Sequence, residues 1–214
     1  MDKKLNIISL NREAWNNVAE KYDNAKYSKL NPAVDFFCRK LPERGSILDI
    51  GSGTGLPFAK LFLEKGFNYL GVDISSQMIN IARKNVPLAK FEEISMTDIN
   101  YNKEFDGVFS HYTMLLLNPE MLRDVAKRVV KSLKGNGLFY LSLNEPRIKD
   151  VDLDEDVICE IMGENMYSRA YTEGEILDVF TPLGLKKLQI YHETQYSEEF
   201  GTEYVLVFVF QKIE

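Results

Sequence analysis

The spacing of apolar residues alternates along the chain between strand-like and helix-like segments. A short apolar run at 47–50 is followed by a glycine-rich turn and then by a helical pattern over 58–66. The alternation returns with a predicted strand at 68–73, after which Ser75 or Ser76 is a suitable cap for the next helix. Strands that alternate with helices predict a mostly parallel sheet with helices on both faces.

The middle of the chain repeats this alternation. Three further strands are expected, at 90–94, 105–110 and 138–143. Between the last two, an apolar stripe of Leu122, Val125, Val129 and Leu133 predicts a helix that stops at the turn 134–137.

The last third of the chain begins with an acidic and aromatic stretch over 144–171 that has no regular pattern. Thr172 and Glu175 then have the spacing of a capping box, which predicts a helix that ends near Pro182. Two closing strands are expected, at 185–191 and 204–210. We expect them to pair antiparallel, and the unbroken apolar run of the second is typical of a strand buried on both sides rather than of an edge strand.

Composition narrows the possible classes of protein. The 214 residues carry 26 Lys and Arg against 32 Asp and Glu, a net charge of −6, so we expect no nucleic-acid partner. The sequence shows no apolar block suited to a signal peptide or a membrane span, and its two cysteines are far apart, which favours the reducing cytoplasm. The two histidines and two cysteines lack the spacing of a zinc site, so we expect no metal.

The glycine-rich turn at 49–55 is the strongest functional signal. Ligands of open α/β sheets bind at the carboxyl ends of the strands, where glycines let the backbone approach the ligand. Asp73 ends the next predicted strand, about twenty residues later, where a carboxylate can accept hydrogen bonds from both ribose hydroxyls. Together these features favour an adenosine-containing ligand over a purely structural turn.

Two details concern which adenosine ligand is bound. A dinucleotide-binding turn has a glycine at its sixth position, where this chain has Leu56, so NAD fits badly. A further acid, Asp98, follows the third predicted strand and is placed to accept a hydrogen bond from an adenine amino group. The alternative for Asp98 is a turn or helix-cap aspartate.

These motifs resemble, in order and over nearly the whole chain, those of class I S-adenosylmethionine-dependent methyltransferases. The segments that carry the resemblance are 47–55, 71–75, Asp98, 105–110 and 133–138. It implies a Rossmann-like three-layer α/β/α sandwich with a seven-stranded, mostly parallel sheet and an antiparallel last strand. It also implies S-adenosylmethionine as the cofactor.

The resemblance further implies which residues hold the cofactor. They are Asp49, Gly51, Ser52, Gly53, Thr54 and Gly55 for the methionine moiety; Asp73 for the ribose; Met96, Thr97 and Asp98 for adenine; and Ser110 near the methionine amino group. Ile74 and Met78 are also expected to contact the cofactor. Tyr27 is expected beside the cofactor as well.

The chemistry makes few demands on the protein. The methyl group of a sulfonium is already activated, so in-line displacement needs mainly proximity, alignment and exclusion of water. A phenol, alcohol or protonated amine acceptor would benefit from a general base, for which His111 is the candidate, with a purely structural histidine as the alternative. Tyr22 is the second catalytic candidate. We expect a small-molecule acceptor and a monomer or homodimer.

The domain organisation follows from these assignments. We expect residues 1–214 to form one domain, and Trp15, Val18, Ala19 and Tyr22 to line the apolar stripe of an N-terminal helix. Its parts are an N-terminal helical lid segment at 1–40, a cofactor-binding core at 41–143, a lid or substrate insertion at 144–171 and a C-terminal helix and strand hairpin at 172–214.

Three hypotheses for function therefore stand: a small-molecule methyltransferase, a nicotinamide-dependent oxidoreductase, and a module that binds S-adenosylmethionine without catalysis.

Overall fold

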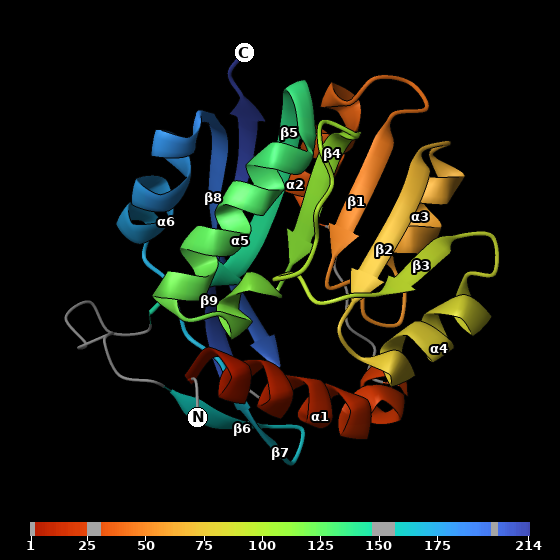
Figure 1. Cartoon of the computed structure of the whole chain (residues 1–214), viewed down its shortest axis with the longest axis vertical. Coiled ribbons are helices and arrows are strands. Elements are labelled where there is room, and N and C mark those ends of the chain that lie inside the picture. Colours follow the sequence, from red (N-terminus) through yellow and green to blue (C-terminus); the bar gives the residue numbers. More distant parts are fainter. Residues whose placement is uncertain (1–2, 25–30, 147–156, 198–200) are drawn as a thin grey trace.

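A seven-stranded sheet runs through the centre of the protein (Figure 1). The computed structural model describes residues 3–24, 31–146, 157–197 and 201–214. Across the sheet the strands are β3 (Lys90–Glu93), β2 (Asn68–Asp73), β1 (Ser46–Ile50), β4 (Phe105–His111), β5 (Leu133–Asn144), β9 (Gly201–Lys212) and β8 (Leu185–Ser197). Pairing is parallel from β3 to β5, whereas β9 is antiparallel to both of its neighbours. The predicted fold class is confirmed, including the antiparallel last strand and its place away from the sheet edge.

Helices cover both faces of this sheet (Figure 1). The helices α2 (Pro32–Lys40), α3 (Phe58–Glu64) and α4 (Ser76–Asn85) bury their apolar residues in one core cluster, with the aromatic side chains of one sheet face. On the other face, α5 (Pro119–Ser132) and α6 (Glu173–Phe180) pack into the second cluster. The N-terminal segment therefore contributes a core helix, α2, in addition to the helix that precedes it.

Helix ends follow the predicted capping residues. Ser75 caps α4, since its hydroxyl accepts a hydrogen bond from the amide of Met78 at 3.1 Å. Thr172 and Glu175 form the expected capping box at the start of α6. Asn118 caps α5 in the same way. Local capping interactions therefore determine where α4, α5 and α6 begin.

The carboxyl ends of the parallel strands are covered by α1 (Lys3–Asn24) and by a small hairpin, β6 (Ile158–Ile161) and β7 (Glu164–Tyr167) (Figure 1). The apolar stripe expected on the N-terminal helix is confirmed in part: Val18 and Ala19 are buried, while Trp15 and Tyr22 are half-buried. In the figure α1 lies across the lower edge of the sheet, with the hairpin beneath it. The short 3-10 helix η1 (Met114–Leu116) lies between β4 and α5 in the chain and is buried.

The structure differs from the expected elements at three places. The helix α5 ends at Ser132, and residues 133–137 already belong to β5, because the pairing of β5 extends beyond its apolar run. The 144–171 stretch contains the β6–β7 hairpin, which a local pattern did not reveal because the residues of β6 are exposed or half-exposed. The closing strands β8 and β9 are longer than expected, since they pair along most of their length.

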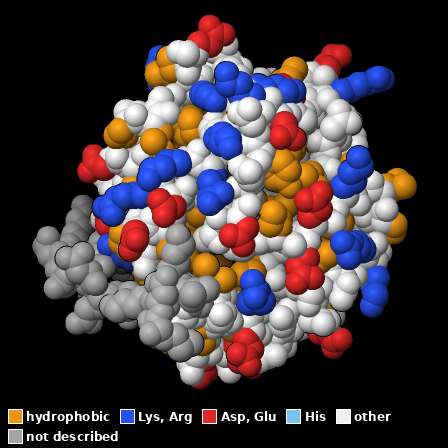
Figure 2. Space-filling model, in the orientation of Figure 1, with side chains coloured by type: hydrophobic (Ala, Val, Ile, Leu, Met, Phe, Trp, Pro, Cys, Tyr) orange, Lys and Arg blue, Asp and Glu red, His pale blue; other side chains and the backbone are white. Residues whose placement is uncertain are grey.

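The visible surface of the molecule mixes charges of both signs. Figure 2 shows Lys and Arg side chains interspersed with Asp and Glu over the face that carries α5 and α6. Of the helices that the structure describes, none has the length and hydropathy needed to cross a bilayer.

Candidate functional site

The glycine loop after β1 is tied to the neighbouring strand by its backbone. The amides of Gly51 and Ser52 both donate to the carbonyl of Val72, at 2.8 and 3.0 Å. Gly51 has a φ of 76°, and a Cβ there would lie 2.2 Å from side-chain atoms of Thr113. Only glycine fits this position, which brings the loop backbone to the end of β4.

Asp73 connects this loop to the start of α4. Its carboxylate accepts from the amide of Gly53 at 3.0 Å and from the amide of Ser75 at 2.8 Å. Burial raises the pKa of Asp73 to about 6, although hydrogen bonds from Ser75 and Gly53 act in the opposite direction. A carboxylate has about four acceptor positions, so Asp73 keeps lone pairs for a ligand.

Asp49 lies beneath the glycine loop rather than at its surface. It is 3% exposed, and its carboxylate accepts a hydrogen bond from the hydroxyl of Tyr69 at 2.7 Å. Burial raises the pKa of Asp49 to about 7, the Tyr69 hydrogen bond lowers it, and the negative charge of Asp73 raises it further. Asp49 and Asp73 therefore form a pair of acids behind and beside the loop.

A cavity opens between the carboxyl ends of the strands and α1. It encloses about 860 Å³ that protein atoms do not fill, open solvent at its mouth included. Its lining is mostly apolar, with Asp73 as a carboxylate. The lining residues are Ile7, Ile8, Asn11, Trp15, Tyr22, Gly51, Gly53, Val72, Asp73, Ile74, Met78, Ile94, Ser95, Met96, Thr97, His111, Tyr112, Thr113, Leu116, Leu117 and Met121.

Many of the expected site residues meet at this cavity. Those that line it are Tyr22, Gly51, Gly53, Asp73, Ile74, Met78, Met96, Thr97 and His111. Those that the structure places outside the lining are Asp49, Ser52, Thr54, Gly55, Asp98 and Ser110. Tyr27 lies outside the described residues. The roles of individual residues toward a cofactor stay predictions.

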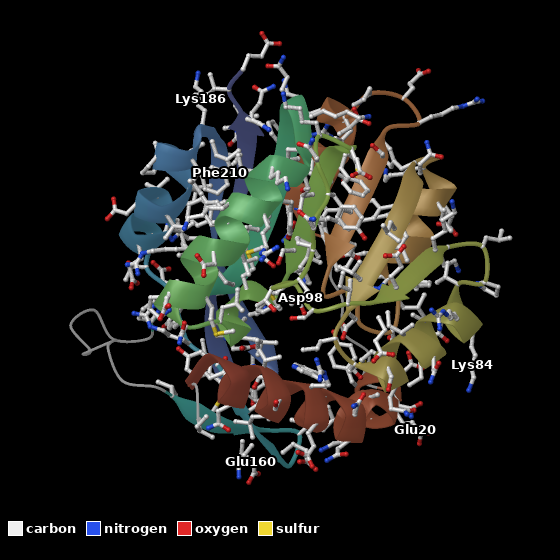
Figure 3. All side chains as sticks on the ribbon, in the orientation of Figure 1. Glu20, Lys84, Asp98, Glu160, Lys186 and Phe210 are labelled. Carbon is white, nitrogen blue, oxygen red and sulfur yellow. The ribbon has the colours of Figure 1, made fainter. Side chains whose placement is uncertain are left out.

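Ser95 takes the position at the cavity that was expected for Asp98. Ser95 is buried in the wall, with its hydroxyl 2.8 Å from the hydroxyl of Thr97. Asp98 is exposed, and its carboxylate oxygen lies 3.4 Å from the Thr97 hydroxyl (Figure 3). Asp98 lies in a turn and outside the cavity lining, so both its expected role toward adenine and the turn alternative stay predictions.

Asn11 is a cavity residue that the sequence pattern did not single out. It is 5% exposed, and its amide nitrogen donates to the carbonyls of Leu116 and Tyr167 at 3.2 and 3.3 Å. Its side-chain oxygen accepts from the amide of Tyr167 at 2.8 Å. One polar side chain of α1 thus joins η1 to β7. A lone asparagine carries no local signal of such a role.

His111 forms the opposite wall of the cavity at the end of β4. Its ring contacts Phe58 edge-to-face at 4.7 Å and lies 4.8 Å from the ring of Tyr112. Burial lowers the pKa of His111 to about 3, so the imidazole is neutral at pH 7. The base role expected for it stays a prediction. Within the described parts of the chain, no group of three or more His, Cys, Asp and Glu could hold a metal ion.

Part of the chain is similar in sequence to known proteins. Residues 47–137 match the family model of the methyltransferase domain. A carboxy-S-adenosyl-L-methionine synthase of Desulfotalea psychrophila is 30% identical over 147 residues, which cover 64% of this chain and 59% of that protein. The matches with the first such curated relatives span between about half and two thirds of their length.

Solved structures share the fold at low sequence identity. The 1,6-didemethyltoxoflavin-N1-methyltransferase of Burkholderia thailandensis, solved with S-adenosylhomocysteine, has a TM-score of 0.78 at 16% identity and covers 100% of this chain and 92% of its own. A methyltransferase structure from Methanosarcina mazei has a TM-score of 0.75 at 19% identity, with 87% of this chain and 99% of that chain covered. Residues 47–137 of this chain thus match a methyltransferase domain, and the chain shares its fold with solved methyltransferase structures.

Proposed function

We propose that this chain binds S-adenosylmethionine in the cavity at the carboxyl edge of the sheet and transfers its methyl group to a small molecule. The observation that carries the proposal is the glycine loop with Asp73 beside it, both facing one cavity. A ribose supplies two hydroxyl donors, and Asp73 keeps acceptor positions for them. Relatives and structural neighbours named for S-adenosylmethionine chemistry support the choice of this ligand.

The residues around the cavity fit each part of such a ligand. The apolar side chains of Ile74, Met78 and Met96 lie where they can pack against a nucleobase, next to Asp73. The Gly53 position is open toward the ring of Tyr22, since a Cβ on Gly53 would be 3.6 Å from that ring. The acids behind the loop are suited to a cationic ligand.

The protein's contribution to catalysis is positioning and water exclusion. When bound, the cofactor supplies a methyl group that is activated by the sulfonium charge. The side chains of Trp15 and Tyr22, in edge-to-face contact at 5.6 Å, close one side of the cavity with apolar surface. The apolar lining from α1 and η1 removes competing water from the place where an acceptor would align.

We also propose that α1 and the 144–171 segment act as one cover over the ligand. Asn11 joins α1 to η1 and β7, and Lys21 donates to the carbonyl of Met162 at 3.1 Å. At the other end, Asp23 accepts from Asn85 of α4 at 2.7 Å. The β6–β7 hairpin, in the second part of the expected lid, is thus bonded to α1, and α1 lines the cavity.

A matched pair of aspartate variants tests the cofactor site. We expect Asp73→Ala to weaken binding of S-adenosylhomocysteine about tenfold to a hundredfold, because ribose hydroxyls would lose their acceptors. Asp98→Ala, a change of the same kind outside the cavity lining, should leave the affinity within about twofold. Isothermal titration calorimetry measures both. Equal losses in the two variants, or binding of NAD in place of S-adenosylhomocysteine, would contradict the proposal.

Turnover separates an enzyme from a binding module. Incubation with S-adenosylmethionine and panels of phenols, amines and carbon acids should release S-adenosylhomocysteine with at least one class. Asp73→Ala should reduce that rate in the same assay. Binding without turnover across all three classes would favour the non-catalytic module.

Limited proteolysis tests the cover. S-adenosylhomocysteine should protect both α1 and the 144–171 segment from cleavage, because α1 lines the cavity and the β6–β7 hairpin of that segment is bonded to α1. Cleavage that is unchanged in either segment would contradict a two-part cover.

A further inference from the structure

A line of polar side chains runs behind His111, on the side of the ring that faces away from the cavity. The register of β4 and β5 pairs His111 with Ser142 and Phe109 with Tyr140. Tyr140 and Ser142 are two residues apart on β5 and therefore project to the same face. Ring atom Nδ1 of His111 lies 2.8 Å from the Ser142 hydroxyl and 3.4 Å from the Tyr140 hydroxyl.

The Tyr140 hydroxyl already accepts a hydrogen bond. Asn31 caps α2, since its side-chain oxygen accepts from the amide of Val34 at 3.1 Å. This cap fixes the orientation of the amide group, so the nitrogen of Asn31 faces Tyr140 and donates to its hydroxyl oxygen at 3.0 Å. The Tyr140 hydroxyl keeps one proton, which needs an acceptor.

The Ser142 hydroxyl also accepts one hydrogen bond and needs an acceptor for its own proton. It accepts from the backbone amide of Tyr112 at 3.2 Å and also has one proton to donate. The two hydroxyls also hydrogen-bond each other, so the Tyr140 proton can go to the Ser142 oxygen and the Ser142 proton to Nδ1 of His111. A proton on Nδ1 would leave one of the two hydroxyls without an acceptor among the contacts that the structure describes, and buried donors without acceptors are strongly disfavoured.

We infer that this network holds His111 with its proton on Nε2, so that the ring presents an N–H donor to the cavity and recognises a ligand atom with a free lone pair. The inference rests on the proposed function for the identity of the site. His111 lines the cavity, and Nε2 is on the side of the ring opposite Nδ1. The ligand atom is an oxygen or an unprotonated nitrogen, of the methyl acceptor or of the cofactor carboxylate.

His111 then positions a ligand instead of removing a proton from it. A base would need a free lone pair on Nε2, and the network gives the lone pair of the ring to Nδ1. The low pKa of His111 agrees with a ring that takes up no second proton. This role differs from the general base expected from the sequence.

Nuclear magnetic resonance of the free protein tests the inference directly. The chain has only two histidines, so His192→Gln, a change at a 52% exposed side chain, leaves His111 as the only one. With nitrogen-15 in the ring, we expect a protonated, pyrrole-type signal from Nε2 and a pyridine-type signal from Nδ1 at pH 6–8. A protonated Nδ1, or a charged ring at pH 7, would overturn the inference. This measurement needs no ligand, so its failure is distinct from a failure to bind S-adenosylhomocysteine.

Removal of the two hydroxyls tests the cause of the arrangement. The double variant Tyr140→Phe with Ser142→Ala should convert the single form of the ring into a mixture of both neutral forms. Ser132→Ala is a matched control, because Ser132 is also fully buried and its hydroxyl donates to Val129 at 2.7 Å, far from the ring. An unchanged ring in the double variant would show that the network does not set the proton position.

Addition of S-adenosylhomocysteine identifies which ligand uses the donor. If the cofactor carboxylate is the partner, the Nε2 signal should shift on binding and His111→Phe should weaken binding at least tenfold. If the methyl acceptor is the partner, His111→Phe should keep the affinity within about twofold and lose turnover. Loss of neither binding nor turnover would overturn the recognition role.

Discussion

The cavity has a floor and a cover that are held in different ways. The floor is the glycine loop with the carboxyl ends of β1, β2 and β4, and backbone hydrogen bonds such as those of Gly51 and Ser52 to Val72 fix it. The cover is α1 with the β6–β7 hairpin, and side chains such as Asn11 hold it in place. The comparison teaches that the floor belongs to the folded sheet, whereas the cover is a separate, more weakly fixed unit above it.

The largest effect is expected from a change in the floor. Gly51→Ala should lower the free energy of unfolding by about 4 kcal/mol, because the new Cβ would clash with Thr113 and the residue has a positive φ. Gly66→Ala has the same backbone strain with nothing within 4 Å, so it should cost about 1 kcal/mol. Denaturant unfolding measures both. Similar losses would show that Thr113 does not confine the loop.

The buried acid of the floor should make stability depend on pH. Asp49 has a pKa of about 7 in the folded protein, above its usual value, so between pH ~4 and ~7 the folded state binds more protons than the unfolded state. Stability should therefore fall as pH rises through this window. Asp49→Asn should remove the part of that fall that comes from Asp49, so that the variant gains on the order of 3 kcal/mol relative to wild type between pH 5 and 8, while the raised pKa of Asp73 keeps a smaller fall.

Asp106 is a control for which the pH dependence of stability is expected to have the opposite direction. Burial raises the pKa of Asp106, but hydrogen bonds from Lys134 and Ser46 outweigh it and lower the pKa below its usual value. The stability from Asp106 is present at neutral pH and is lost as pH falls through the lowered pKa. Asp106→Asn should therefore cost most at neutral pH. The same direction of pH dependence in both variants would contradict the assignment.

The cover should respond locally to loss of Asn11. Asn11→Ala removes three hydrogen bonds to the backbone of Leu116 and Tyr167, so local opening of α1 and β7 should become easier by about 2 kcal/mol. Hydrogen exchange should speed up in α1 and β7 and stay unchanged in β1 and β4. Asn6→Ala, at an exposed position of the same helix, is the control. Equal acceleration throughout the sheet would remove the distinction between floor and cover.

The smallest effect is expected behind His111. Tyr140→Phe removes one of the acceptors of the Asn31 amide group, which also hydrogen-bonds Glu193, and should cost about 1 kcal/mol of unfolding free energy. Tyr101→Phe removes a hydroxyl that bonds Glu92 at the surface, so it should change stability by less than about 0.5 kcal/mol. Thermal unfolding compares them. A larger loss of unfolding free energy in Tyr101→Phe than in Tyr140→Phe would show that the buried network contributes less to stability than the surface hydrogen bond of Tyr101.

The sequence predicted the floor well because its signals are local. Glycines after a strand, an acid at the end of the next strand and the Ser75 cap each act through near neighbours, and the structure brings Gly51, Gly53 and Asp73 to one cavity. Asp98 is less sharply marked by local spacing. The turn after β3 buries Ser95 in the cavity wall and leaves Asp98 exposed, while the role of Asp98 stays a prediction.

The cover and the His111 network could not be predicted because distant residues make them. Asn11 and Tyr167 are 156 positions apart in sequence, and no local pattern marks either for the other. Ser142 reaches His111 only through the register of β4 with β5, which the apolar runs do not determine. The sequence pattern therefore identified His111 as a candidate site residue. It did not reveal Ser142 and Tyr140, the partners that we infer to determine which ring nitrogen carries the proton.

One contact joins the two units at the nucleoside end of the cavity. Asn16 of α1 accepts from the Ser75 hydroxyl at 2.7 Å, and the amide of Ser75 in turn donates to Asp73. The position of α1 and the carboxylate of Asp73 are thus linked through one serine. If the proposed cofactor binds at Asp73, this link is reciprocal: the factor by which the ligand favours the closed position of α1 equals the factor by which closure raises the affinity for the ligand.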